Sequence, residues 1–565
     1  ITESAFSFIK RIIKHLLPTN FKSIRSYGFY NKPSKLPEDT NMLISKEKIP
    51  MIISTDEFIE NKHLYLGTSP IYEGVKINVE VDVANGLPAF DIVGLPTMSV
   101  REARERVKSA LRNSDYPFPM THITVNLAPA DLKKEGSGLD LPIAIGILVS
   151  AKFIEQQMTE GKIFVGELSL DGALRKVNGV LSMIMEAKRS GFKEIYIPQE
   201  NAAEGKLVTG IDVYTPQNLK ELVKHLQGSV KLTPLPKENI LQNLERAYDV
   251  DFSDVKGQPV ARRALEIAAA GGHSILLMGA PGCGKTMLAR RLVTILPPVT
   301  EAEALEITKI YSIANMLPDG ERVMVERPFR SPHHSVSASA LLGGGSYPRP
   351  GEVTLSHNGV LFLDELPEFE RYTLEMLRQP LEDGEVNISR VRASVSYPSR
   401  FVLVAAQNPC PCGYLGDKVH RCSCKQKDID NYRRKISGPL LDRIDMQINL
   451  VRVEYSELKD KAAGESSREI RKRVVAARNR QLERFAGNGI YCNGQMTRRE
   501  VVQYCVMDET AQNVLGKYFT ALHLSARSHD RILKVARTIA DLEGSEKITA
   551  SHIAEAIQLR TSISS

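Results

Sequence analysis

The stretch that decides the fold is residues 274–296, which read SILLMGAPGCGKTMLARRLVTIL. It begins as a short apolar run typical of a buried strand, passes through a glycine-rich turn and continues with the apolar spacing of a helix. The turn has the form G-x-x-x-x-G-K-[ST], in which backbone N–H groups close around phosphate oxygens. A chance glycine-rich turn would lack this strand–loop–helix context. We therefore predict a phosphate-binding loop formed by Gly279, Ala280, Pro281, Gly282, Cys283, Gly284, Lys285 and Thr286.

The last two residues of this loop and a second motif predict hydrolytic chemistry. Lys285 is expected to reach the β- and γ-phosphates of a nucleotide, and Thr286 to ligate Mg²⁺. Residues 359–365 (GVLFLDE) form an apolar run that ends in two acids, which a buried parallel strand would deliver to the ligand-binding edge of a sheet. Asp364 is then expected to hold Mg²⁺, and Glu365 to orient and deprotonate the attacking water. Acids at a strand end are often only solvated turn residues, but this pair follows a phosphate loop.

A third apolar run carries the next candidate. Residues 401–406 (FVLVAA) predict another strand, and Asn408 follows its end. A polar side chain there is suited to a hydrogen bond with the γ-phosphate or the attacking water.

Length and composition set the wider limits. The chain has 565 residues, which corresponds to about three to four domains. Charged residues make up 25% and hydrophobic residues 42%, as in an ordinary globular protein. Seven cysteines are too few for a disulfide scaffold, and no apolar run reaches the roughly 18 residues of a membrane span. The net charge of +7 hints at nucleic acid or another anionic ligand without showing either.

The pattern along the chain predicts a mixed α/β protein with several domains. Residues 62–228 alternate strands and helices, beginning with an apolar–polar alternation at residues 77–83, and residues 229–249 read as a linker. A second α/β unit is predicted over residues 250–454. Residues 455–565 have an almost wholly helical pattern with 18 Lys and Arg against 13 Asp and Glu, so most of the excess positive charge lies there.

The first segment of the chain, residues 1–61, is expected to be a basic, poorly ordered extension. Residues 1–37 carry seven basic residues and one acid, and residues 5–17 have helical apolar spacing. Such a segment also weakly resembles a targeting or membrane-surface helix. The ordered part of the protein is expected to begin near residue 62.

Residues 62–565 resemble the magnesium-chelatase-like AAA+ ATPases of the YifB/ComM type. The resemblance is carried by DVKGQPVARRALEIAAAGGH at 254–273, RPFRSPHHSVSASALLGGG at 327–345, SGPLLDRIDM at 437–446 and VEVDVANGLPAFDIVGLP at 79–96, together with the motifs above. It implies an AAA+ P-loop ATPase core, a C-terminal helical lid, ATP and Mg²⁺ as ligands and a bacterial cytoplasmic location. It also implies a ring, by analogy a hexamer, with ATP bound between subunits.

The same resemblance assigns roles to three polar residues. Asn408 corresponds to sensor 1, Arg443 to the arginine finger that acts on a neighbour's ATP, and Arg527 to sensor 2 in the lid. A guanidinium at the γ-phosphate offsets charge in the transition state, which agrees with both arginine roles. The ordinary alternative for each arginine is a surface ion pair. Arg531 is an alternative to Arg527, which we prefer for its spacing to the segment that follows.

The front domain resembles the C-terminal domain of Lon protease, through residues 165–198. Lon-type proteolysis needs a Ser nucleophile and a Lys base. The Ser position aligns with Gly138, beside Ser137, and the Lys position aligns with Leu181, which cannot take a proton. We therefore expect the fold without the peptidase chemistry, unless the alignment slips and another base such as Lys176 serves.

Four of the seven cysteines form a cluster next to Asn408: Cys410, Cys412, Cys422 and Cys424. Four thiolates within 15 residues can close a tetrahedral zinc site, and His420 is a substitute ligand. The C-x-C spacing differs from the usual C-x₂₋₄-C. Reduced free thiols, a redox pair and chance are the alternatives, of which a disulfide is least expected in a reducing cytosol. We expect a structural zinc ion.

Three segments are candidates for DNA contact. Residues 382–398 predict a β-hairpin on which Arg390 and Arg392 share one strand face, and in related ring ATPases such hairpins point into the pore. A solvated strand face is the alternative. Residues 329–345 resemble the family's second pore-directed insert. The cationic helical stretch 468–484 would suit phosphate contact, although a solvated helix with ion pairs is the commoner explanation.

These features leave three functional hypotheses. The first is an ATP-driven ring motor acting on DNA, with helicase or branch-migration activity in DNA uptake or recombination. The alternative is a magnesium-chelatase-like ATPase that remodels a protein partner for metal insertion. The third, a scaffold in which the nucleotide only controls assembly, is disfavoured by Glu365 and Arg443.

Overall fold

The computed structural model describes residues 63–69, 75–129, 134, 136–237, 248–317, 323–344, 349–390, 393–417, 419–453, 464–521 and 524–561. The predicted basic extension at residues 1–61, Arg392 and most of the second half of the predicted linker lie outside these residues. Across the part of the chain that the structure describes, no helix is long and apolar enough to cross a bilayer.

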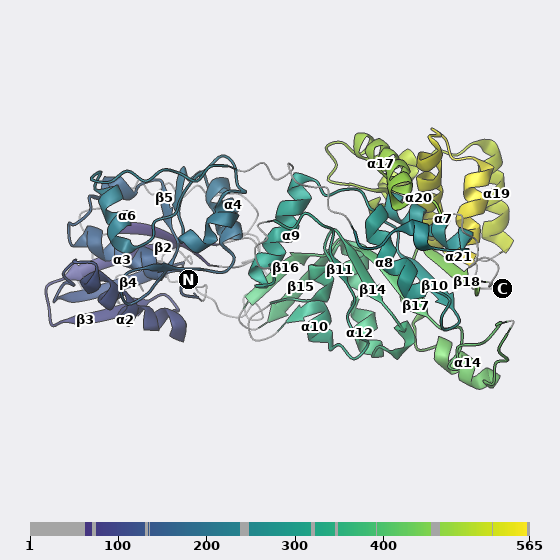
Figure 1. The fold of residues 1–565 in the computed structure, drawn as a ribbon, viewed down its shortest axis with the longest axis horizontal. Coiled ribbons are helices and arrows are strands. Elements are labelled where there is room, and N and C mark those ends of the chain that lie inside the picture. The colour runs from purple at the N-terminus through teal and green to yellow at the C-terminus, as the bar shows by residue number, and fades with distance from the viewer. Residues whose placement is uncertain are drawn as a thin grey trace, which may run out of the picture. The chain divides into compact units, whose positions relative to one another are not determined.

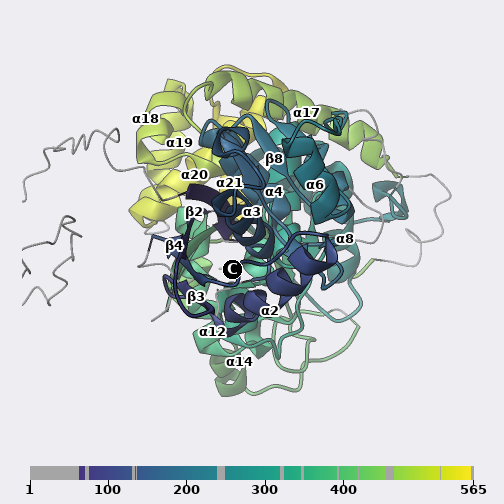
Figure 2. The same ribbon diagram turned by 90° about the vertical axis from the view of Figure 1, so that its left-hand side faces the viewer.

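The front region begins with a four-stranded mixed sheet of order β1-β2-β4-β3. Its strands are β1 (His63–Ser69), β2 (Val75–Ala84), β3 (Ala89–Val93) and β4 (His122–Ala128). The predicted alternation in β2 is confirmed, because Ile77, Val79 and Val81 are buried. Figure 2 shows helices α2 (Met98–Asn113) and α3 (Asp140–Ser150) beside these strands, and α3 is buried along nearly its whole length.

The second half of the front region has a separate sheet. Its three short parallel strands are β5 (Lys162–Phe164), β8 (Glu194–Tyr196) and β9 (Asp212–Tyr214). A small antiparallel pair joins β6 (Glu167–Leu168) to β7 (Leu174–Arg175). The helices here are α4 (Val180–Arg189), α5 (Ala202–Gly205) and α6 (Leu219–Leu226).

A five-stranded parallel sheet of order β11-β14-β17-β10-β18 forms the centre of the region that follows (Figure 1). The strands are β11 (Phe329–Arg330), β14 (Val360–Leu363), β17 (Val402–Gln407), β10 (Ile275–Gly279) and β18 (Met446–Leu450). Every residue of β10 and β14 is buried, and each buried Leu or Ile side chain contributes about 1.5–3 kcal/mol. Because all five strands are parallel, their carboxyl ends meet at one edge of the sheet.

Helices and small strand pairs surround this sheet. The helices are α7 (Pro259–Gly271), α8 (Lys285–Ile295), α9 (Glu301–Ile313), α10 (Ala338–Leu342), α11 (Glu352–Leu355), α12 (Arg371–Met376), α13 (Arg378–Asp383), α14 (Gln426–Arg433) and α15 (Gly438–Leu441). Strand β12 (Gly343–Gly344) pairs with β13 (Arg349–Pro350). The predicted hairpin is confirmed as β15 (Glu385–Arg390) paired antiparallel with β16 (Ala393–Pro398). Local sequence sets the ends of α7, which has Pro259 at its first position and stops at the left-handed Gly272.

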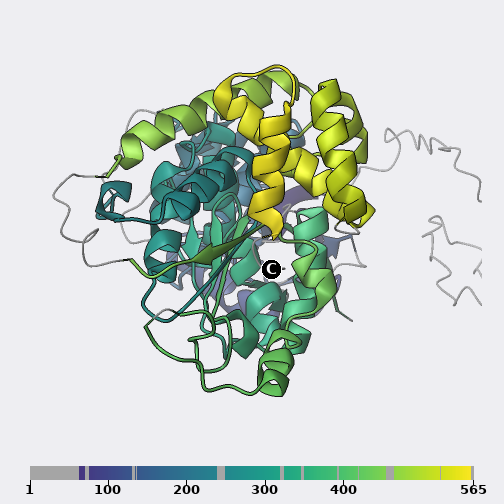
Figure 3. The same cartoon turned by 90° about the vertical axis from the view of Figure 1, so that its right-hand side faces the viewer.

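The C-terminal region is helical, as its sequence pattern predicts. Its helices are α17 (Ser467–Arg484), α18 (Arg498–Tyr504), α19 (Glu509–Ala521), α20 (Ala526–Glu543) and α21 (Ala550–Thr561), the yellow-green group in Figure 3. Their buried residues share one hydrophobic cluster with α7, α8 and the central sheet. The C-terminal helices therefore fold against the ATPase sheet and α7 rather than as a separate body.

Candidate active site

The predicted phosphate loop connects β10 to α8. Gly282 and Gly284 have φ of +79° and +92°, a region that residues with a side chain rarely adopt. A Cβ on Gly279 would lie 2.7 Å from the Cys283 sulfur and 3.0 Å from the Leu450 carbonyl oxygen. The glycines of the motif are therefore required by backbone geometry and close packing. Burial raises the pKa of the Cys283 thiol above its ordinary value.

Lys285 turns its ammonium group back over the loop. Its Nζ donates to the carbonyl oxygens of Gly279 at 2.6 Å and Ala280 at 3.2 Å, and to Oδ1 of Asn408 at 3.0 Å. Burial lowers the pKa of Lys285 below its ordinary value. The structure thus brings the predicted sensor-1 residue into direct contact with the phosphate-loop lysine.

Thr286 and Asp364 face each other across the carboxyl ends of β10 and β14. The Thr286 hydroxyl donates to Oδ2 of Asp364 at 2.8 Å, while Oδ1 of Asp364 accepts from the backbone N–H of Glu365 at 2.9 Å. Thr286 is exposed, so the pair is accessible. Hydroxyl and carboxylate oxygens are ligands that Mg²⁺ prefers, and the two side chains therefore fit the predicted magnesium role.

Glu365 follows β14 in a left-handed backbone conformation, with φ of +52°. Such a conformation is uncommon for residues other than glycine and is found at functional sites. Its carboxylate is half exposed, and Oε2 lies 3.4 Å from Nδ1 of His334. Sequence reasoning missed this contact. The signal was topological: β11 is the parallel neighbour of β14, so residues after β11 lie near residues after β14.

Asn408 takes its position from the strand order. It follows β17, which lies between β14 and β10, and so it stands between the acidic pair and the phosphate loop. The hydroxyl of Tyr432 accepts from the backbone N–H of Asn408, and burial raises the pKa of Tyr432 to about 12.

The two predicted arginines meet on one carboxylate that sequence reasoning did not identify. Oε2 of Glu382 lies 2.6 Å from Nη2 of Arg443, and Oε1 lies 3.5 Å from Nη2 of Arg527. Burial acts to raise the pKa of Glu382, but Arg443 and Arg527 hold it below its ordinary value. The Arg443 side chain is only 5% exposed, whereas Arg527 is 60% exposed. Nε of Arg443 is buried and has no hydrogen-bond partner among the described residues.

Arg531, the alternative to Arg527, has a different environment. It donates to Oδ1 of Asp445, a buried carboxylate that also accepts from the Ser274 backbone N–H at 3.0 Å. Burial acts to raise the pKa of Asp445, but Arg531 and His273 hold it well below its ordinary value. Arg531 is therefore part of a buried ion pair between α20 and the start of β18, whereas the Arg527 side chain is exposed.

The candidate DNA-contacting segments differ in what the structure shows. Arg390 ends β15, and its side chain, like the whole of Arg392, lies outside the described part. In α17, which covers the predicted cationic stretch 468–484, five of the six arginines bind within the chain, and Arg468 is exposed. Examples are Arg471 to the Thr294 carbonyl oxygen at 2.7 Å and Arg473 to Glu266 at 2.6 Å. These contacts therefore agree better with a helix whose charges are paired within the chain than with a helix that binds phosphate.

In the front region the positions aligned with a peptidase dyad are packed. A Cβ on Gly138 would lie 3.2 Å from a methyl group of Val177. Leu181 is fully buried, and its backbone N–H donates to Glu204 at 3.1 Å. Lys176 is exposed. Neither aligned position offers an ionisable side chain.

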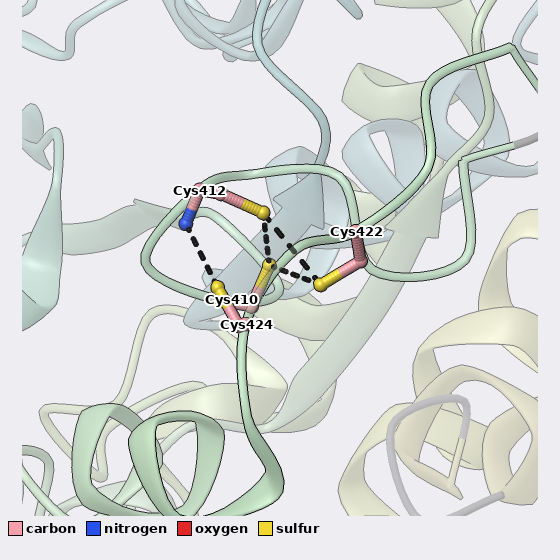
Figure 4. A group of neighbouring side chains, drawn as sticks. All are labelled: Cys410, Cys412, Cys422 and Cys424. Atoms are coloured by element: carbon pink, nitrogen blue, oxygen red, sulfur yellow. Dashed lines mark hydrogen bonds between the residues drawn. The ribbon is translucent and has the colours of Figure 1, made fainter.

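The four clustered cysteines converge on one point (Figure 4). All four sulfurs lie within 4.8 Å of one another, and the pairs Cys410–Cys412, Cys410–Cys422 and Cys412–Cys422 are 3.4, 3.7 and 3.6 Å apart. A disulfide requires about 2.05 Å, and all four are free thiols. Four sulfurs at 2.3 Å from a tetrahedral Zn²⁺ would lie about 3.8 Å apart. The three printed distances are close to this value, and the four sulfurs together are compatible with a four-thiolate metal site.

A parallel sheet that presents a phosphate loop, an Asp-Glu pair and a polar sensor at one edge defines a P-loop ATPase of the AAA+ type. Comparison with known families agrees. Residues 251–458 match "Magnesium chelatase, subunit ChlI", residues 79–201 match "Subunit ChlI of Mg-chelatase", and residues 464–560 match the subunit ChlI C-terminal family.

Two relatives that match along nearly their whole length indicate which branch of this family the chain belongs to. The chain is 45% identical over 485 residues to the uncharacterized protein YifB of Salmonella typhimurium, covering 86% of this chain and 94% of the relative. It is 44% identical over 491 residues to the competence protein ComM of Haemophilus influenzae, covering 86% and 95%. The magnesium-chelatase 38 kDa subunit of Rhodobacter capsulatus is 27% identical over 176 residues, 28% of this chain and 50% of that protein. The chain belongs to the YifB/ComM-type magnesium-chelatase-like family and is an ATPase of that class.

Proposed function

We propose that this chain is an ATP-hydrolysing ring motor that acts on DNA, as a helicase or in branch migration, during DNA uptake or recombination. The observation that carries the hydrolytic part is the single group formed by Lys285, Asn408, Thr286, Asp364 and Glu365 at the sheet edge. The DNA part is supported by the competence protein ComM, a relative over 95% of its own length.

The chemistry follows from these contacts. Lys285 exchanges its bonds with the carbonyl oxygens of Gly279 and Ala280 for the β- and γ-phosphate oxygens, while Asn408 fixes its direction. Thr286 and Asp364 would hold Mg²⁺ in place of their mutual hydrogen bond. When bound, Mg²⁺ offsets charge on the phosphate oxygens. The half-exposed carboxylate of Glu365 then accepts the proton of the attacking water.

We propose a hexameric ring in which Arg443 acts on the ATP of the neighbouring subunit and Arg527 serves as sensor 2. In the single chain both guanidinium groups are held by Glu382, and the Arg443 Nε keeps an unused donor. A phosphate from the neighbour would take the place of the carboxylate. Mixing Arg443→Ala with Lys285→Ala subunits should restore part of the activity, because only mixed interfaces pair an intact loop with an intact finger. No recovery in a confirmed mixed ring contradicts action in trans.

The DNA contact is proposed at the hairpin β15–β16, through Arg390 and Arg392. Replacing both with Ala should weaken binding to all DNA sequences alike. It should also make the slope of log affinity against log salt less steep, by the amount expected for about two lost phosphate contacts. An unchanged slope of log affinity against log salt would place the DNA elsewhere on the chain.

The decisive experiment measures ATP hydrolysis with no DNA, with single-stranded DNA and with branched DNA. Lys285→Ala should abolish hydrolysis, and Glu365→Gln should abolish it while ATP still binds. Stimulation by DNA supports the motor. Hydrolysis without DNA binding at low salt would instead favour the second candidate, a chelatase-like ATPase that remodels a protein partner. That candidate rests on the family descriptions, which name magnesium chelatase over all three matched segments.

We propose that the front region is a Lon-like structural or binding module without peptidase activity. Gly138 and Leu181 occupy the positions of the nucleophile and the base, and the buried Leu181 has no ionisable group. A casein digest with ATP at neutral pH should show no cleavage. Cleavage that is lost in Ser137→Ala would contradict this assignment.

We propose that the four cysteines bind a structural Zn²⁺ ion. The sulfurs of Cys410, Cys412 and Cys422 lie 3.4–3.7 Å apart and all four sulfurs lie within 4.8 Å of one another, which suits a tetrahedral four-thiolate site, and thiolate ligands favour zinc over magnesium. Metal analysis of protein purified without chelators should give about one zinc per chain. Less than about half a zinc per chain counts against the site.

A further inference from the structure

The cysteine cluster lies beside the nucleotide site rather than at a remote surface. Cys410 is fully buried and follows Asn408 by two residues, in the loop that leaves β17 (Figure 4). The loop returns through Cys422 and Cys424 and then enters α14. The four sulfurs therefore tie the segment that carries Asn408 to the segment that leads into α14.

The near half of the loop packs directly on the phosphate loop. Gly413 has φ of +87°, and a Cβ on it would lie 2.7 Å from Cδ of Pro281 and 3.9 Å from Cγ of Asn408. Only a residue without a side chain fits at this distance. Any displacement of the loop would therefore move atoms that contact both Pro281 and Asn408.

The far half of the loop is attached at two more points. The hydroxyl of Tyr432 in α14 accepts from the backbone N–H of Asn408. Asp417 accepts from the backbone N–H groups of Val419 and His420 at 2.7 and 2.9 Å, and its second oxygen lies 3.6 Å from Nη2 of Arg452, just after β18. Both ends of the loop thus reach the sheet edge that holds the phosphate loop.

Between β17 and α14 the described part of the loop contains no helix or strand. Its backbone order therefore comes from turns, from these attachments, from the contact between the Tyr414 and His420 rings at 4.8 Å and from the cysteine cluster. A tetrahedral metal fixes four points of such a loop at once.

We infer that the metal held by the four cysteines is a positioning element of the ATP site, which keeps the Asn408 amide on Lys285 and Gly413 on the phosphate loop. This inference rests on the proposed ATPase and zinc assignments. The cysteines are positioning residues, since none of them contacts the reacting atoms. Loss of the metal should slow hydrolysis far more than it weakens ATP binding, because the phosphate loop itself is built from β10 and α8.

The test compares the full-length chain with the double variant Cys422→Ser/Cys424→Ser. Both cysteines are partly exposed and lie away from Asn408 in sequence, so the variant leaves the buried Cys410 intact. Ser423→Ala is the matched control, because Ser423 is exposed in the same C-x-C segment and is not a ligand. Zinc content, the dissociation constant for ATP, kcat and KM are measured for each protein.

The double variant is expected to lose its zinc and to lose about tenfold to 100-fold in kcat, the cost of a small misplacement of a catalytic group, while ATP binding changes less than about threefold. Ser423→Ala is expected to match the wild type. Adding Asn408→Ala to the double variant should cause little further loss, because both changes act through the same amide.

Each contrary result has a separate meaning. Wild-type kcat in a zinc-free double variant, or losses that multiply when Asn408→Ala is added, overturns the positioning role. Wild-type protein without zinc overturns the metal site and the inference with it. Wild-type protein that holds zinc but does not hydrolyse ATP overturns the proposed function and, with it, this role.

Discussion

Replacing Arg531 with Met tests the ion pair that joins the C-terminal helices to the sheet. The change removes the guanidinium next to Asp445 but keeps an unbranched side chain of similar reach. Asp445 is left 7% exposed, with the Ser274 N–H at 3.0 Å and His273 at 3.4 Å as its contacts and with Lys534 and Arg560 as nearby cations. A buried carboxylate that loses its directly bonded cation loses more in Coulomb energy than these neighbours return.

The magnitude follows from burial. Breaking a buried pair typically costs about 3–5 kcal/mol, and the remaining contacts and cations around Asp445 place the expected cost near the lower end, about 3 kcal/mol. For the roughly 300 residues of the sheet and its C-terminal helices, each kcal/mol lowers Tm by about 1.5 °C. Arg531→Met should therefore lower the Tm of this region by roughly 4–5 °C in a thermal unfolding scan.

Arg498→Met is the matched control. Arg498 pairs with Asp530 at 3.0 Å, but its side chain is 69% exposed, so the loss should stay below about 1 kcal/mol. If Arg531→Met lowers Tm no more than Arg498→Met, burial does not increase the cost of losing the Arg531–Asp445 pair.

The pH dependence gives a second check on Asp445. Its pKa is lower in the folded chain than in the unfolded chain, so its contribution to stability is present above about pH 4 and is lost as the pH falls. The Tm difference between wild type and Arg531→Met should therefore shrink in acid. A difference that stays constant down to pH 3 would contradict the assignment.

Three further changes test other contacts. Glu365→Gln should lower kcat at least about 100-fold because the general base is lost, while ATP affinity in a binding assay stays within about threefold; retained turnover would contradict the role. Glu382→Gln should free Arg443 for phosphate and lower the KM for ATP by up to about fivefold, because a partly exposed ion pair is worth up to about 1 kcal/mol. A higher KM in steady-state kinetics would argue that Glu382 and phosphate do not compete for Arg443. Arg106→Met should remove the cation that lies 2.6 Å from the buried carboxylate of Asp140, which is 1% exposed. The free energy of unfolding of the front region, measured in urea, should then fall by at least about 3 kcal/mol, and an unchanged urea midpoint would refute this.

The sequence was most informative where chemistry depends on local geometry. The phosphate loop needs glycines at fixed positions, and Gly282 and Gly284 do have positive φ. Asp364 and Asn408 follow buried strands, and the parallel order of β14, β17 and β10 brings both to the phosphate loop. The cysteine cluster was also predictable, because a single reversal of the chain between the two C-x-C pairs is enough to bring all four sulfurs together.

The contacts that escaped prediction link residues distant along the chain. Glu382 has no motif of its own, and only the folded chain shows that it meets Arg443 and Arg527. The charge of α17 left phosphate contact open beside the commoner explanation of ion pairs, and Arg471 and Arg473 do bind groups within the chain. Net charge counts ionic groups but does not tell which of them are already paired.

The burial of Cys283 has a consequence for how thiol reagents act on this protein. Cys283 belongs to the phosphate loop, but it is 4% exposed and burial raises its pKa, so alkylating reagents should spare it. Cys492 and Cys505 are buried as well, which leaves Cys412, Cys422 and Cys424 as the accessible thiols. Inactivation by an alkylating reagent would then report on the metal cluster rather than on the nucleotide pocket, and protection by zinc rather than by ATP would be its signature.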